Sequence, residues 1–304
     1  MNTTPEHILS VCPLPGLGFI LVKGADAESF LQGQLSQNIQ GLGPNEAPLA
    51  AWHSAAGRVK ALFRVLRTGE DWLLVTENDL AGSVTNDLQR FVIRAEVTIN
   101  EDGRRWRAAA LVGDADGWLD QHDIDLSHDP GRRVSVNGLS WLRIGPQLVH
   151  VIGSEAATAK LEAEFPHGAI GDASLAEISL GLPRLTRELQ DRFVPQMLNL
   201  DLLGALDESK GCYPGQEIIA RTQNLGAVKR RMVRFSADLI RAPGVGTLIL
   251  NEAGDTTGNV IRSSKAAEKI EILAVTRLNC LDQPLVSEVE PQVRLRRESL
   301  PYEN

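Results

Sequence analysis

The chain has 304 residues, 43% of them hydrophobic, which is enough for two or three domains with buried cores. Its net charge of −8 argues against stable nucleic-acid binding, because such binding depends on neutralising phosphates. The first residues lack a basic segment and no apolar run approaches the roughly 18 residues of a membrane span, so we expect a cytoplasmic protein without a membrane partner.

The first 112 residues predict an α+β domain. Strands are expected over residues 17–23, 47–53, 58–67, 71–76 and 94–99. Helices follow the first and fourth strands, begun by Asp26 and Asn78. The order β-α-β-β-β-α-β fits helices on a largely antiparallel sheet. Arg94 and Glu96 on the last strand are candidates to line a pocket, the alternative being a polar strand face.

The remaining chain predicts two further units. An acidic, turn-rich loop over 113–133 lies among short strands at 106–112, 140–145 and 148–152, before helices begun by Ser154 and Asp172. From Lys229 onward, short strands broken by Gly and Pro predict a small closed or partly closed β-barrel. These strands are expected over 230–236, 246–251, 257–263, 269–278 and 292–297.

One turn carries the most specific chemical signal. In the segment 210–217, KGCYPGQE, Pro214 and Gly215 suit the central positions of a type II turn, and the following residues predict a helix. A thiol near Lys210 and a helix N-terminus has its thiolate form stabilised, so Cys212 is a candidate nucleophilic or redox residue. The alternative is a small buried residue in a turn selected for geometry.

The three cysteines, Cys12, Cys212 and Cys280, are far apart and show no CxxC spacing. This distribution argues against a disulfide framework and against a local zinc or iron–sulfur ligand set. We therefore expect no resident metal.

The cysteine turn and its flanks resemble the signature of the YgfZ family of folate-binding proteins. The matching segments are 24–35, 181–183, 193–201, 210–217, 220–221, 229–230 and 300–302. The family is similar to the T-protein of the glycine cleavage system, an aminomethyltransferase. The resemblance implies a multi-domain aminomethyltransferase-like α+β fold with ferredoxin-like antiparallel sheets and a C-terminal β-barrel around a central tetrahydrofolate pocket. We assign residues 1–112 to a first, folate-binding α+β domain. Residues 113–228 form a second α+β domain that is interleaved with the first and carries the cysteine turn, and residues 229–304 form the C-terminal β-barrel.

The resemblance also implies a role and a set of site residues. The family supports iron–sulfur cluster assembly or repair in client enzymes, including tRNA-modifying ones, so we expect folate and those enzymes as partners. Cys212 and Lys210 are the expected reactive pair, although Lys210 could simply be solvated. The expected folate-binding residues are Tyr213, Gln216, Glu217, Arg221 and Arg94. The alternative for Glu217 is a purely structural ion pair with Arg221, and the alternative for Gln216 is a hydrogen bond to the backbone.

Two other functions stay open. A folate-dependent aminomethyl or one-carbon transferase would need a carboxylate beside the folate for proton transfer. A tRNA-contacting module would use the basic cluster from Lys229 to Arg234. The acidic net charge of the chain argues against this function.

Overall fold

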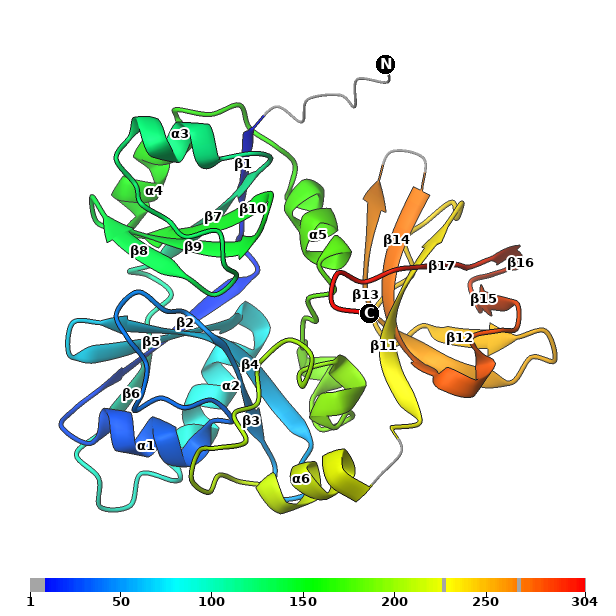
Figure 1. Ribbon diagram of the computed structural model, residues 1–304, viewed down its shortest axis with the longest axis horizontal. Coiled ribbons are helices and arrows are strands. Elements are labelled where there is room, and N and C mark those ends of the chain that lie inside the picture. The colour runs from blue at the N-terminus through cyan, green and yellow to red at the C-terminus, as the bar shows by residue number, and fades with distance from the viewer. Residues whose placement is uncertain (1–8, 226–227, 267–268, 304) are drawn as a thin grey trace.

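The computed structural model describes residues 9–225, 228–266 and 269–303. Three antiparallel sheets surround the centre of the molecule, with helix α5 (Ile170–Ser179) between the N-terminal pair of sheets and the C-terminal one (Figure 1). The predicted α+β class is therefore confirmed. No helix within these residues has the length and apolar character needed to cross a membrane.

The first sheet has the strand order β3-β4-β5-β2-β6. Its strands are β2 (Leu17–Lys23), β3 (Leu49–His53), β4 (Val59–Thr68), β5 (Asp71–Glu77) and β6 (Thr98–Glu101). Helices α1 (Ala27–Gln34) and α2 (Asn78–Gln89) share a hydrophobic core with one face of this sheet. Because side chains alternate along a strand, Phe63 of β4 faces these helices while its neighbour Arg64 faces the centre of the molecule.

The second sheet packs against the central face of the first. Its order is β1-β7-β10-β9-β8, formed by β1 (Ser10–Pro13), β7 (Arg107–Val112), β8 (Arg133–Val136), β9 (Leu139–Gly145) and β10 (Leu148–Gly153). Leu142 and Ile144 of β9 share a core with Leu73 and Val75 of β5. Two helices accompany this sheet, α3 (Asp116–Gln121) and α4 (Glu155–Glu162).

The C-terminal sheet is a curled half-barrel with the order β16-β15-β12-β13-β14-β11-β17. Its strands are β11 (Arg230–Ala237), β12 (Leu248–Asn251), β13 (Thr256–Ala266), β14 (Lys269–Arg277), β15 (Leu285–Ser287), β16 (Glu290–Arg294) and β17 (Arg296–Glu298). Between α5 and β11 the chain forms 3-10 turns at Arg187–Leu189 and Pro195–Leu198 and then helix α6 (Gln216–Leu225). A further 3-10 turn, Leu278–Cys280, follows β14.

Several local predictions need correction. The strand expected over 94–99 begins only at Thr98, so Arg94 and Glu96 are exposed in the bend before it, where Glu96 N bonds Asp26 Oδ2 instead of a neighbouring strand. The helix expected from Asp172 begins two residues earlier, and Asp172 accepts a hydrogen bond from the Ala169 amide at its start. The acidic 113–133 region contains α3, whose Leu119 is buried in the core of the second sheet.

Candidate functional site

An inner cavity of about 80 Å³ lies where the three sheets meet. The first sheet contributes Arg64 and Glu77, the second contributes His150, α5 contributes Glu177, and the C-terminal sheet contributes Arg262. The loop after α5 adds Arg184, and the remaining lining is mostly apolar. Charged side chains therefore converge from distant parts of the chain into an apolar shell, as they do in ligand sites.

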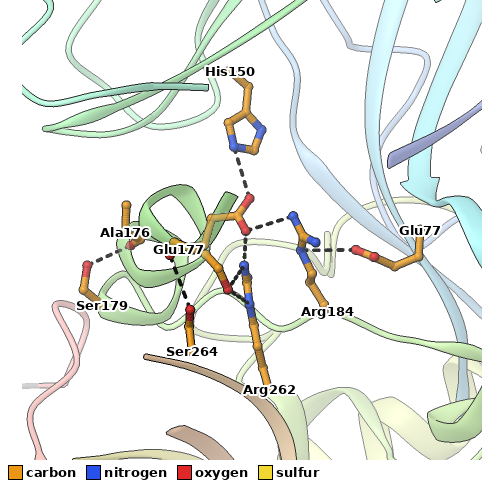
Figure 2. Close-up of polar contacts among 10 residues, drawn as sticks. Glu77, His150, Ala176, Glu177, Ser179, Arg184, Arg262 and Ser264 are labelled. Carbon is orange, nitrogen blue, oxygen red and sulfur yellow. Dashed lines mark hydrogen bonds and ion pairs between the residues drawn. The ribbon is translucent and has the colours of Figure 1, made fainter. Parts of the chain in front are cut away.

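Glu177 is the centre of this charged cluster (Figure 2). Its carboxylate accepts a hydrogen bond from Arg262 Nη2, lies 3.1 Å from Arg184 Nη2 and lies 3.1 Å from His150 Nε2. Burial alone would raise the pKa of Glu177, but Arg262, His150 and Arg184 together outweigh burial and hold it well below its usual value. Glu177 is thus a fixed negative charge that joins α5 to β13.

Glu77 is a different kind of carboxyl. It ends β5, and Arg184 Nε lies 3.4 Å from its Oε1, at the right of Figure 2. Burial raises its pKa to about 7, against which Arg184 and Arg262 act only partly. Glu77 can therefore hold or release a proton near neutral pH, the property that acid–base chemistry requires.

One charged side chain that lines the inner cavity has a buried polar atom without a hydrogen-bond partner among the described residues. It is Nη1 of Arg262. Buried polar atoms are normally satisfied, so unsatisfied ones in a cavity mark positions that a ligand or water completes.

An outer cavity of about 770 Å³ adjoins the inner one and shares Leu49, Arg64, Ile144 and Leu182 with it. Its volume lies within the roughly 300–1,000 Å³ typical of small-molecule pockets. Gln37 and Asp207 line its wall on the side that leads to the cysteine turn. The two cavities together form a wide chamber with a narrow, charged inner end.

Lys210 connects this wall to the cysteine turn. The ammonium is buried and donates to the backbone carbonyls of Gln32 at 2.5 Å, Gln37 at 3.2 Å and Leu35. It also lies 5.0 Å from the centre of the Tyr213 ring, and burial lowers its pKa to about 8. Lys210 is thus an anchor between the turn and the loop after α1, which excludes the solvated alternative to its expected reactive role.

The turn itself is seated on the β3–β4 hairpin. Gly215 has a φ of +77°, which confirms the positive φ predicted from the Pro-Gly pair. A Cβ at this position would come within 2.5 Å of Ser54 O. Nearby, the buried His53 ring lies 5.8 Å from that of Tyr213, and burial, then Lys210, lowers its pKa to about 3.

The structure brings some of the predicted site residues together. Tyr213 and Gln216 line a small cavity of about 150 Å³ that shares Asp207 with the outer one. Cys212 is exposed. Glu217 and Arg221 are exposed on α6, and no ion pair joins them among the described contacts. Arg94 is exposed in the bend before β6 and lines neither the inner nor the outer cavity.

The charged residues of the inner cavity were not predicted from the sequence. Arg64 and Glu77 interrupt the inward, apolar side of β4 and β5, in VKALFRVL and DWLLVTE. A charge on the buried face of a strand is a usable signal, because charged side chains are almost never buried without a partner or a function. Glu177 carries a similar signal within α5.

The chain is similar over nearly its whole length to several known bacterial proteins. A protein of Haemophilus influenzae without assigned function is 28% identical over 291 residues, which cover 93% of this chain and 94% of that protein. Two proteins named tRNA-modifying protein YgfZ, from Escherichia coli and Cronobacter sakazakii, are 25% and 27% identical, each covering 97% of this chain and 93% of the relative. No protein-family model matches the chain.

Among solved structures, the glycine cleavage system aminomethyltransferase T from Bartonella henselae superposes with a TM-score of 0.78 at 13% identity, covering 97% of this chain and 86% of that one. At this identity the likeness establishes the fold. The predicted aminomethyltransferase-like fold is confirmed, and its C-terminal part is the curled half-barrel sheet. The chain is thus a full-length relative of the YgfZ proteins, as its cysteine-turn motif indicated, built on the fold of aminomethyltransferase T.

Proposed function

We propose that this protein binds tetrahydrofolate, or a derivative of it, in the central chamber and supports the assembly or repair of iron–sulfur clusters in client enzymes, including tRNA-modifying ones. The observation that carries the proposal is the chamber itself. Lys210 donates a hydrogen bond to Gln37 in the wall of the chamber, and it lies two residues before the exposed Cys212. The relationship to proteins named for tRNA modification supports the choice of clients.

The residues of the chamber fit a folate. The outer cavity has the volume of a small-molecule site, and its apolar residues, such as Leu182 and Leu203, suit a flat ring system. The inner end offers Nη1 of Arg262 as an unsatisfied polar atom and Glu77 as a carboxyl that can be protonated. These groups would hold polar ligand atoms by hydrogen bonds, while the apolar lining excludes water. A bound tetrahydrofolate supplies a carrier for one-carbon groups.

Cys212 is proposed to act outside the chamber, on the client. Its exposure allows contact with another protein, and Lys210 and Gly215 fix the backbone that presents it. A cytoplasmic location, where free thiols stay reduced, suits this role.

The experiment combines binding and complementation. Tetrahydrofolate should raise the melting temperature of the wild type and of C212S alike, because a ligand that binds only the native state stabilises it. In cells lacking the native protein, the wild type should restore iron–sulfur enzyme activity and C212S should not, while S209A serves as a control for disturbance of the same exposed turn. Full complementation by C212S would refute the thiol role, and an unchanged melting temperature would refute folate binding.

The transferase alternative gains support from Glu77, which supplies the carboxylate that proton transfer beside a folate requires. Turnover of a one-carbon group by the purified protein with 5,10-methylenetetrahydrofolate, lost in E77Q, would favour a transferase. Complementation by E77Q in the absence of any turnover would favour the accessory role.

A further inference from the structure

Arg64 is a cation on a cavity wall that forms no ion pair with any described residue. It lies on β4 with its side chain on the central face, between the apolar residues Leu62 and Leu66, and it lines both the inner and the outer cavity. Its one hydrogen bond to a described residue joins Nη1 to the carbonyl oxygen of Ala47 at 3.3 Å. No ion pair reaches it among the residues that the structure describes. Most of its five N–H donors are therefore available to a ligand.

The neighbouring charges balance it only in part, because Glu177 attracts the Arg64 guanidinium from beyond ion-pair distance. Arg64, Arg184 and Arg262 line the inner cavity against only Glu77 and Glu177, before any charge on His150 is counted. Glu177 is already shared by Arg262 and Arg184, and Glu77 lies against Arg184. The excess positive charge at the inner end therefore resides on Arg64.

The carboxylates of the outer cavity are also committed elsewhere. Glu46 pairs with Arg132, Asp129 accepts from Ser127, and Asp207 accepts from Ser209. Burial lowers the pKa of the Arg64 guanidinium to about 10, and the negative charge of Glu177 opposes this only partly, so Arg64 stays charged at neutral pH despite the cost of desolvation. An unpaired charge in such surroundings is unfavourable and is typical of a binding residue rather than of a structural one.

We propose that Arg64 binds a carboxylate group of the ligand at the junction of the inner and outer cavities. A planar guanidinium matches a carboxylate with two parallel hydrogen bonds, which suits a position open on both sides. The carboxylate has two chemical sources: the glutamate part of a folate, or a separate small carboxylate beside the pterin. The first source rests on the proposed folate function, whereas the anion site itself does not.

Anaerobic calorimetry with tetrahydrofolate, 6-methyltetrahydropterin, acetate and glycine distinguishes these sources. The variants are R64Q and R64K, with R67Q as the matched control, since Arg67 on the same strand pairs with Glu28 near the surface. Removing a half-buried charge that forms no ion pair should leave the melting temperature of R64Q at or above that of the wild type, which shows that it folds. R64K keeps the charge but loses the fork and should bind with intermediate affinity.

If the carboxylate belongs to the folate, the wild type and R67Q bind tetrahydrofolate at least about tenfold more tightly than the pterin, and R64Q loses that difference. If it belongs to a second ligand, acetate or glycine tightens pterin binding in the wild type and not in R64Q. Either pattern supports the proposal, and unchanged affinities in R64Q for every probe overturn it. If neither tetrahydrofolate nor 6-methyltetrahydropterin binds the wild type, the proposed folate function fails. The anion site is then tested by the melting temperature in acetate. A rise in the wild type but not in R64Q supports the site, and equal shifts in the two proteins overturn it.

Discussion

Arg262 of β13 donates a hydrogen bond to the carboxylate of Glu177 on α5, and both side chains are buried. The same arginine also reaches Ser174 Oγ at 3.0 Å. Through this pair the C-terminal sheet is joined to the helix that flanks the second sheet, and the inner cavity lies at the junction. The central charge cluster is therefore a link between sheets as well as a lining.

Replacing Glu177 with Gln should destabilise the protein strongly. It leaves the Arg262 charge buried without its main partner, which typically costs about 3–5 kcal/mol of unfolding free energy. Urea denaturation provides the measurement. The control is E252Q, because Glu252 pairs with Arg294 on the surface and should change stability by less than about 1 kcal/mol. Equal effects of the two variants would contradict the assigned role of Glu177.

Glu77 should make stability depend on pH between about 4.5 and 7. Its pKa is raised by burial from 4.5 to about 7, so the folded state binds more protons than the unfolded state in this window. Its contribution is fully present below pH 4.5 and is lost as pH rises through 7, an effect on the order of 3 kcal/mol. Denaturation of the wild type and E77Q across this window measures it. The variant should show a flatter profile, and parallel profiles would rule out the raised pKa.

Gly215 should tolerate no side chain. In G215A a Cβ would meet Ser54 O at 2.5 Å, and φ of +77° is strained for alanine, so we expect a loss of at least about 1–3 kcal/mol in stability. G204A separates the two causes, since Gly204 has a φ of +65° but open space around its Cβ position. G211A, with neither constraint, should be neutral. Thermal melting of all three tests this order, and an unaltered G215A would refute the seating of the turn on the hairpin.

Lys210 should hold the cysteine turn to the loop after α1. K210M removes charge-assisted hydrogen bonds to three carbonyl groups, each worth about 1.5–3 kcal/mol net. Amide hydrogen exchange in the segment 210–221 should accelerate, whereas K269M, at an exposed position on β14, should leave it unchanged. Unaltered protection in K210M would mean that the anchor is dispensable.

Local patterns predicted much of the fold. The strand expected over 17–23 matches β2, and Ser154 caps α4 by accepting from the amide of Ala157, because these features depend on neighbours in sequence. The Pro-Gly turn likewise needs only its own residues to set φ at Gly215. Arg94 was misplaced because β6 is short and begins only where pairing with Lys23 becomes available, at Thr98.

The inner cavity could not be assembled from such patterns. Its charged residues come from β4, β5, β10, α5, β13 and the loop after α5, and only tertiary packing brings them together. A solvated Lys210 stayed open as an alternative because nothing near it in sequence supplies acceptors. Those acceptors are carbonyls about 175 residues away.

The most direct test of folate binding in the chamber is a larger side chain at the junction of its two cavities. Leu182 lines both the inner and the outer cavity, and in L182W the indole would occupy their junction. Calorimetric titration with tetrahydrofolate should show binding to the wild type and to C212S, and a loss of at least about 100-fold in affinity for L182W that melts like the wild type. Undiminished binding to a folded L182W would show that the folate lies elsewhere and would contradict the account.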